Sequence, residues 1–142
     1  MSLEQIEAAI PHRKPMLLLD EIVERHAERI VCRKTFQEDE FFLQGHFPGM
    51  PVVPGVILCE ASMQAGAVLL ASQLASAGEG APVATRMNNV KFRRMVQPGD
   101  TIEIEVTLNE RMADAFFMTA KVTVGGKVAV RFDFACTVAK AA

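Results

Sequence analysis

Two residues in the segment 45–64 have the side-chain types and the setting for acid–base chemistry. His46 is flanked by a glycine and by a Phe-Pro-Gly run, so its imidazole stands on a loop with little backbone freedom. Imidazole exchanges protons near neutral pH, which suits a catalytic base. Glu60 is the only charged residue on a long apolar stretch. Burial among apolar side chains favours the neutral carboxyl, which can donate a proton, so the pair predicts elimination of water.

Three further residues of the same segment fit that chemistry. Gln64 follows Glu60 by four positions, which places both on one face of a helix, where the amide can hydrogen-bond and orient the carboxyl. Gly55 and Val56 open the apolar helix, where backbone N–H groups have no intrahelical acceptor and lie at the positive end of the helix dipole. A substrate carbonyl oxygen that gains negative charge there would be stabilised by roughly 3 kcal/mol per donor. We therefore expect base, acid and carbonyl-binding amides in one site.

Each candidate also has a purely structural interpretation. A histidine beside Phe-Pro commonly makes a loop hydrogen bond, and Glu60 can be a buried carboxyl that backbone amides satisfy. The spacing of Glu60 from His46 favours chemistry for both. His12 is expected to support a loop, and His26, in a charged turn, to be solvated. The histidines and cysteines are not at ligand spacing such as CxxC or HxxxH, so no metal site is expected.

The composition limits the classes of protein. The chain has 142 residues, of which 50% are apolar, and we expect a single domain over residues 1–142. Lys and Arg number 15 against 17 Asp and Glu, and the formal net charge of -2 argues against a nucleic-acid partner. Cys32, Cys59 and Cys136 are an odd count in apolar surroundings, which predicts reduced thiols and a cytoplasmic location.

Neither a membrane span nor a signal peptide is expected. The longest weakly polar stretch, residues 51–77, is interrupted by a proline, a glutamate and glutamines, whereas a lipid-facing span needs about 20 apolar residues. The first ten residues carry two glutamates and lack the basic start of a signal peptide. The apolar stretch is therefore predicted to be a buried helix.

The periodicity predicts an α+β fold. Apolar residues on nearly every face of the stretch 56–76 predict a helix surrounded by protein, and prolines and glycines make residues 41–55 a rigid loop. Polar and apolar side chains alternate most clearly at residues 101–106, and Gly125-Gly126 predicts a hairpin turn. The expected order is a helix at 2–10, strands at 16–22 and 29–36, the loop and the long helix, and antiparallel strands at 83–92, 101–111, 115–124 and 127–138.

These elements fit a curved antiparallel sheet wrapped around one long central helix. Such a sheet leaves edge strands with unpaired backbone groups. Pairing with a second copy joins two sheets and removes an exposed edge. We therefore expect a homodimer as the minimum unit.

The motifs resemble those of one known family. The run His46-Phe47-Pro48-Gly49-Met50-Pro51-Val52-Val53-Pro54-Gly55-Val56, with Glu60 and Gln64, resembles the signature of the FabZ-type (3R)-hydroxyacyl-[acyl-carrier-protein] dehydratases. The segments 11–20, 91–94 and 98–100 resemble the same family in order and spacing. The resemblance covers nearly the whole chain.

This resemblance implies the hotdog fold, in dimers that commonly assemble into hexamers as trimers of dimers. It also implies an active site built across the dimer interface, with His46 and Glu60 of one site supplied by different subunits. The implied substrate is a (3R)-3-hydroxyacyl chain on the phosphopantetheine arm of acyl carrier protein. The implied product is the trans-2-enoyl chain of fatty acid biosynthesis, formed without a metal or redox cofactor.

The sequence leaves some alternatives open. Lys91, Arg93 and Arg94 form a basic cluster that is either a solvated strand end or a docking surface for the acidic carrier protein. A hotdog-fold hydratase or thioesterase acting on coenzyme A thioesters is the enzymatic alternative, and a non-catalytic acyl-binding module is the alternative from another class. The loop-borne histidine favours dehydration over the first, and the presence of all the acid–base residues argues against the second.

Overall fold

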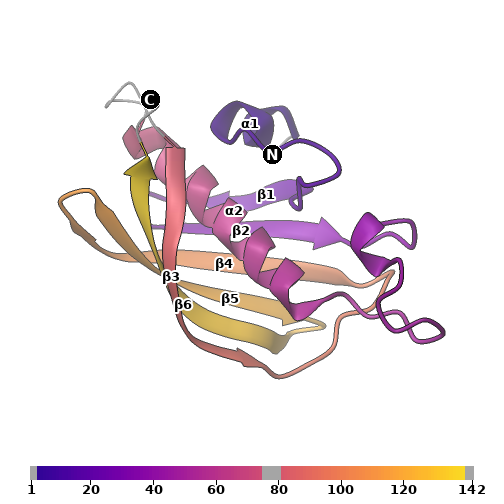
Figure 1. The fold of residues 1–142 in the computed structure, drawn as a ribbon. Coiled ribbons are helices and arrows are strands. Elements are labelled where there is room, and N and C mark those ends of the chain that lie inside the picture. The colour runs from indigo at the N-terminus through magenta and orange to yellow at the C-terminus, as the bar shows by residue number, and fades with distance from the viewer. Residues whose placement is uncertain (1–2, 75–80, 140–142) are drawn as a thin grey trace.

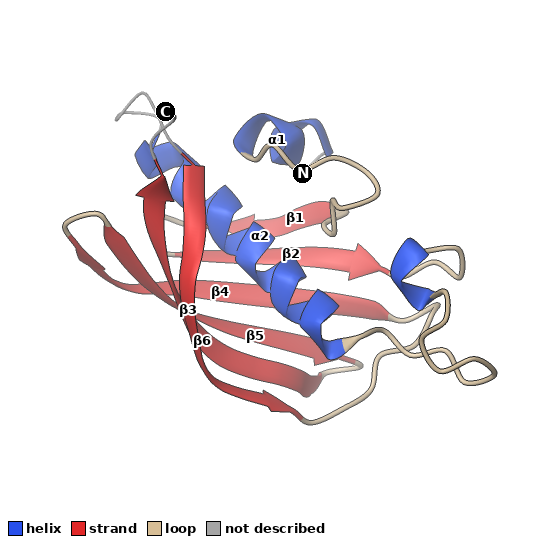
Figure 2. Cartoon of the chain, viewed as in Figure 1, coloured by secondary structure: helices blue, strands red, loops and turns tan. Residues whose placement is uncertain are grey.

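One long helix crosses a curved antiparallel sheet (Figure 1). The computed structural model describes residues 3–74 and 81–139. Within these residues the sheet has the strand order β1-β2-β4-β5-β6-β3, with every pair of neighbours antiparallel. Figure 2 distinguishes its helices from its strands. The elements are α1 (Leu3–Ala9), β1 (Glu21–Arg25), β2 (Arg29–Thr35), the 3-10 turn η1 (Phe41–Leu43), α2 (Gly55–Leu74), β3 (Ala81–Phe92), β4 (Thr101–Met112), β5 (Ala115–Val124) and β6 (Lys127–Ala139).

The helix α2 forms the centre of the hydrophobic core. Most of its residues are buried, among them Leu58, Ala65 and Leu69. Gly66 allows the sheet to come close, since a Cβ atom there would lie 2.9 Å from Cζ of Phe134 on β6. By length and composition α2 could cross a membrane. Its burial inside the chain is instead that of a core helix.

Strand β4 shows why the sheet turns one face to α2. Its residues Ile102, Ile104 and Val106 are buried, and the residues between them point outward. On the outer face Glu105 forms a salt bridge with Arg29. Glu103 forms a second salt bridge with Arg33, with 2.9 Å between the carboxylate oxygen and the guanidinium nitrogen. The predicted alternation is confirmed, and it separates an apolar inner face from a charged outer face.

Strand β3 is an edge of the sheet. It pairs with β6 on one side, and its residues from Val83 to Asn89 are exposed in the single chain. The register shifts twice along this pairing, between Ala84 and Arg86 and between Asn88 and Lys91. Bulges of this kind twist an edge strand. The opposite edge is the shorter strand β1.

The predicted elements agree with the structure except at some boundaries. The strand expected at 16–22 was wrong over most of its length, because β1 starts at Glu21 and the chain before it is irregular. The three consecutive leucines at 17–19 are all buried. An apolar run can therefore come from an irregular segment that is buried on every side, and it does not require a strand. The loop at 41–55 contains the 3-10 turn η1. The expected start of the first helix at residue 2 and the end of the long helix at 75–76 lie outside the described residues.

Candidate active site

The loop between η1 and α2 fixes the position of His46. The backbone N–H of His46 donates to the Leu43 carbonyl oxygen at 3.3 Å, which ties it to the end of η1. Its two neighbours are left-handed, Gly45 at a φ of 77° and Phe47 at a φ of 54°. This conformation is common for glycine but costs an aromatic residue about 1–2 kcal/mol. Strained residues of this kind concentrate at functional sites.

The imidazole of His46 has a defined tautomer. Its Nδ1 atom lies 2.9 Å from the carbonyl oxygen of Val52. A carbonyl oxygen only accepts hydrogen bonds, so Nδ1 carries the proton and donates it. The neutral ring then has an unprotonated Nε2, which can accept a proton from a substrate. The loop thus orients the ring and determines which of its nitrogens is free to accept a proton.

His46 shares a cavity with the start of α2. The cavity has a volume of about 380 Å³ and is lined by His46, Gly55, Val56, Phe92 and Arg94 among others. The ring of Phe92 covers Gly55 so closely that a Cβ atom there would lie 2.5 Å from Cε1 of the ring. Gly55 and Val56, whose N–H groups have no intrahelical acceptor, therefore line the same cavity as the imidazole.

Glu60 lies one turn after Val56 on α2, and its carboxyl contacts other polar side chains. Gln64 Nε2 donates to Glu60 Oε2 at 2.9 Å, which is the contact expected from their spacing. Gln64 is itself buried and fixed by the backbone, since it also donates to the Met16 carbonyl oxygen at 2.8 Å and accepts from the Leu18 N–H at 2.9 Å. The chain before β1 therefore holds the amide that contacts the carboxyl.

His12 is a neighbour of Glu60 that the sequence did not reveal. Its Nε2 lies 3.7 Å from Glu60 Oε2, and its buried Nδ1 has no hydrogen-bond partner within the described residues. The two side chains are about one-third exposed in the single chain, 32% and 31%. Residues 12 and 60 are too far apart in sequence for any periodicity to pair them. Its place beside Arg13 indicated a loop, and its place in the segment 11–20 that resembles the family was the one sequence signal that pointed to function.

Among the residues that the structure describes, His46 and Glu60 line two different cavities of one chain. Glu60 lines a smaller cavity of about 120 Å³, together with His12, Gln64 and residues of β3 and β6. His46 lines the cavity at the start of α2 described above. The single chain therefore brings His46 together with Gly55 and Val56, and Glu60 together with Gln64, as two separate groups.

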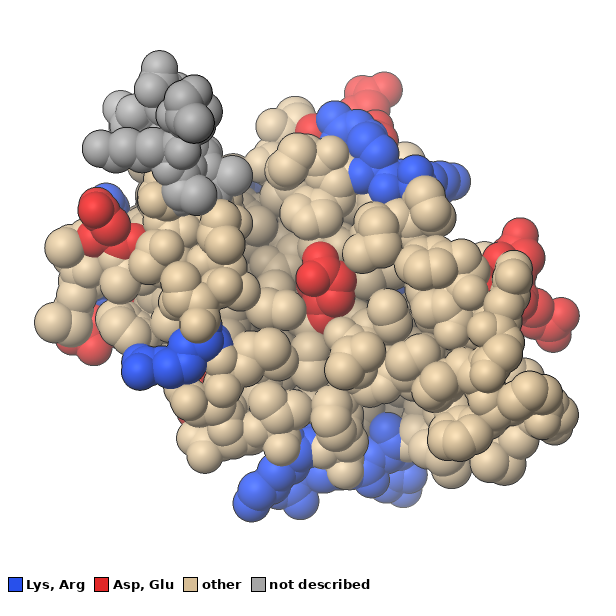
Figure 3. Space-filling view, in the orientation of Figure 1, with Lys and Arg blue, Asp and Glu red and all other residues tan. Residues whose placement is uncertain are grey.

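The basic cluster lies beside the cavity of His46. Lys91, Arg93 and Arg94 are all exposed, at and just after the end of β3, and Arg94 lines that cavity. Figure 3 shows Lys and Arg side chains along the lower rim of the visible face, in the region where Figure 1 shows the end of β3. Exposed apolar side chains adjoin it, including Phe92 and Met95, which are 54% and 61% exposed.

The chain is similar to known proteins over nearly its whole length. Residues 10–133 match the family described as the FabA-like domain. A protein of Oenococcus oeni named 3-hydroxyacyl-[acyl-carrier-protein] dehydratase FabZ is 42% identical over 134 residues, which are 94% of this chain and 96% of the relative. A protein of the same name from Koribacter versatilis is 38% identical over 139 residues, with 97% of this chain and 89% of the relative covered.

Solved structures share the fold at much lower identity. The dehydratase heterocomplex ApeI:P from Xenorhabdus doucetiae matches with a TM-score of 0.82 and 17% identity, over 95% of this chain and 91% of that chain. The E. coli PaaI protein matches with a TM-score of 0.71 and 18% identity, over 96% and 92%. These likenesses confirm the predicted hotdog fold and nothing beyond the fold. The matched domain and the sequence identities together place the chain in the family of FabZ-type 3-hydroxyacyl-[acyl-carrier-protein] dehydratases.

Proposed function

We propose that this chain dehydrates (3R)-3-hydroxyacyl chains carried by acyl carrier protein to trans-2-enoyl chains in fatty acid biosynthesis. The observation that carries the proposal is the hydrogen bond from His46 Nδ1 to the Val52 carbonyl oxygen, which leaves Nε2 as a base beside the start of α2. The names of the relatives from Oenococcus oeni and Koribacter versatilis support the same reaction and the same carrier.

The elimination needs a base, an acid and a place for negative charge. His46 Nε2 takes the proton from the carbon between the thioester carbonyl and the hydroxyl-bearing carbon. The electron pair of that C–H bond forms the new C=C bond, and negative charge on the carbonyl oxygen is met by the N–H groups of Gly55 and Val56. The bond from carbon to the hydroxyl oxygen breaks, and the Glu60 carboxyl supplies the proton with which that oxygen leaves as water.

The two halves of this apparatus require a second copy of the chain. His46 and Glu60 line separate cavities of one chain, while β3 presents an exposed edge near both groups. Pairing of two β3 edges in a homodimer would remove that edge and cover the apolar side chains around the cavity. We propose that one complete site takes His46 from one subunit and Glu60 from the other. Three such dimers would form a hexamer.

The carrier protein is proposed to dock beside the cavity. Lys91, Arg93 and Arg94 are exposed at the end of β3, and a surface of this charge attracts an acidic partner. Arg94 also lines the cavity of His46, so a carrier bound there would have its phosphopantetheine arm next to the base. Reduced cysteines and a carrier-bound substrate fit a cytoplasmic enzyme.

The first test removes each proposed catalytic group. His46→Ala and Glu60→Gln should each lower dehydration turnover by about 100-fold or more, because a positioned acid or base typically contributes that much. Exposed residues provide matched controls, His26→Ala in the turn before β2 and Glu110→Gln on β4. Wild-type turnover in a folded His46→Ala or Glu60→Gln protein would refute the assigned roles.

The second test examines the shared site. Mixing the two inactive variants under conditions that exchange subunits creates mixed dimers, in which one of the two sites has both His46 and Glu60. About a quarter of the wild-type activity is expected when mixing is statistical and subunits pair at random. Proven subunit exchange without any recovery would show that both residues act within one chain.

A further inference from the structure

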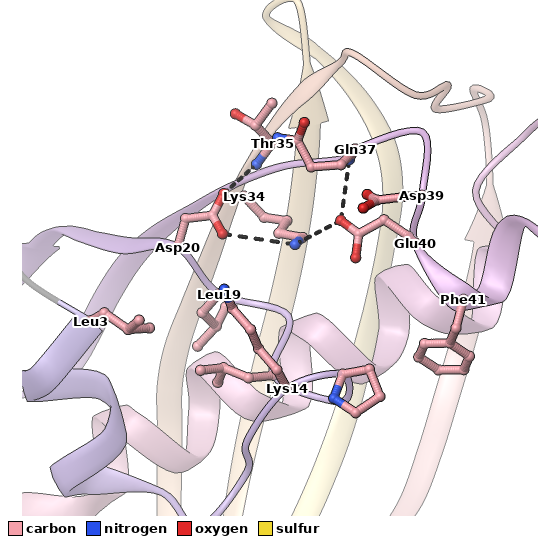
Figure 4. A pocket seen from close by; sticks show the side chains of 12 residues that line it. Leu3, Lys14, Leu19, Asp20, Lys34, Thr35, Gln37, Asp39, Glu40 and Phe41 are labelled. Atoms are coloured by element: carbon pink, nitrogen blue, oxygen red, sulfur yellow. Dashed lines mark hydrogen bonds and ion pairs between the residues drawn. The ribbon is translucent and has the colours of Figure 1, made fainter.

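A buried ammonium group lies at the end of β2, outside the proposed catalytic apparatus. Lys34 is 7% exposed, although lysine is almost never fully buried unless it is paired. Its Nζ atom lies 2.9 Å from Glu40 Oε2 and 3.7 Å from Asp20 Oδ1. Figure 4 shows the ammonium between the two carboxylates, with Glu40 on the segment that leads toward η1. The ion pair thus joins β2 to the residue just before η1, which leads into the loop that carries His46.

A short series of hydrogen bonds leads from this ion pair to His46. Glu40 Oε2 also accepts the backbone N–H of Gln37 at 3.2 Å, and the Glu40 carbonyl oxygen accepts the N–H of Leu43 at 3.1 Å. The Leu43 carbonyl oxygen in turn accepts the N–H of His46 at 3.3 Å. The side chain of Glu40 therefore fixes the turn before η1, and its backbone fixes the turn that ends at the base.

Two more contacts hold the same region. Asp20 Oδ2 accepts the backbone N–H of Thr35 at 2.7 Å, so this carboxylate is itself fixed against the end of β2. The Lys34 ammonium lies 5.6 Å from the centre of the Phe36 ring, and that ring packs edge-on against Phe42 of η1 at 5.8 Å. The ammonium is thus surrounded by groups that connect β2 with η1.

We propose that Lys34 is a positioning residue for His46, acting through Glu40 and η1. The proposal rests on the proposed function, in which His46 is the base. Without the ammonium, the Glu40 carboxylate, whose side chain is 14% exposed, would lose its nearest positive charge and turn toward water, whereas the Asp20 carboxylate is already exposed. The Gln37–Glu40 turn would then open, and η1 would no longer hold the imidazole against Val52. Because a small displacement of a catalytic group costs much rate, the chemical step is the one affected.

The experiment replaces the ammonium and observes the imidazole directly. Lys34→Met keeps the length of the side chain and removes its charge, and Lys34→Arg keeps the charge. Lys121→Met is the matched control, because Lys121 pairs at 3.7 Å with Glu105 on the exposed outer face of the sheet. For each full-length oligomer, kcat, KM and the imidazole 15N resonances of His46 are measured, with the thermal midpoint as a check of folding.

Lys34→Met should lower kcat by about tenfold or more while KM changes by less than about threefold. The His46 15N resonances should move away from those of a ring protonated at Nδ1, and Lys34→Arg should recover part of both effects. The control should leave both unchanged. If Lys34→Met does not fold, Glu40→Gln removes the pair from the other side and is expected to give the same shift and the same fall in kcat.

Unchanged His46 resonances in folded Lys34→Met or Glu40→Gln protein overturn the proposal, whatever happens to turnover. A lower thermal midpoint with wild-type kcat also overturns it, because Lys34 would then stabilise the fold only. The resonance measurement does not depend on the catalytic role of His46. Wild-type turnover in His46→Ala would refute the proposed function, while the imidazole shift would still decide whether Lys34 positions the ring.

Discussion

The side chain of Gln64 hydrogen-bonds both Glu60 and the backbone before β1. Replacing Gln64 by leucine tests how much this junction of hydrogen bonds contributes to stability and to turnover. The Gln64→Leu change keeps the approximate volume of the side chain. It removes three hydrogen bonds, with Glu60 Oε2, the Met16 carbonyl oxygen and the Leu18 N–H. Gln64 is 1% exposed and Leu18 is 0% exposed, so water cannot replace the lost amide at the Leu18 N–H.

The three lost bonds have different costs. Leu18 is 0% exposed, and a buried donor without a partner costs about 1–3 kcal/mol. Met16 is 42% exposed and the Glu60 carboxyl is partly exposed, so water can replace the amide at both. Burial of the added apolar surface offsets a part of the loss. We expect the free energy of unfolding to fall by about 2 kcal/mol, most of it from the Leu18 N–H.

The turnover should fall as well, since the Glu60 carboxyl loses the group that orients it. A decrease of about tenfold is expected from misplacement alone. Urea unfolding at a fixed protomer concentration measures the first effect, because the stability of an oligomer depends on that concentration. The control is Gln97→Leu, an exposed glutamine whose contact with Asp100 is made by its backbone N–H. A loss of less than about 0.5 kcal/mol in Gln64→Leu would refute this account of the junction.

Two further predictions concern the core. Gly66→Ala should lower the free energy of unfolding by about 1–3 kcal/mol in urea titrations, because its Cβ atom would meet the buried Phe134 ring at 2.9 Å; an unchanged midpoint would contradict this. Burial raises the pKa of Cys32 to about 12 and the pKa values of Cys59 and Cys136 to about 11. Labelling by a thiol reagent at pH 8 should therefore be about 100-fold slower in the folded protein than in urea. Stability should be independent of these thiols below about pH 9 and fall as the pH rises further, since the unfolded chain loses the thiol protons first.

The sequence predicted the central part of the fold because local chemistry determines it there. Alternation along β4 predicted which of its side chains face α2, and Gly125-Gly126 forms the predicted hairpin turn with φ values of 57° and 78°. The contact of Gln64 with Glu60 followed from helix geometry alone. Each of these features depends on residues that are close in sequence.

The features that the sequence missed depend on contacts between distant segments. The apolar run at residues 17–19 resembles a strand, but its backbone N–H at Leu18 bonds a side chain of α2 instead of a neighbouring strand. His12 reaches Glu60 only because the chain before β1 folds back onto α2. Nothing in the sequence around Lys34 predicts that it is buried. Its ion pairs with Asp20 and Glu40 are visible only in the structure. No periodicity in the sequence encodes such contacts.

Under the proposed shared site, α2 serves two sites at once. The N–H groups at its start face the cavity of His46 in the same chain, whereas Glu60, one turn later, would complete the site of the partner. Val56 and Glu60 are four residues apart, which fixes them about 6 Å from each other along a rigid helix. A movement of α2 therefore shifts the carbonyl-binding amides of one site and the acid of the other together. His46 is the only one of the three groups that a loop carries, so contacts to that loop can adjust the base without moving the helix.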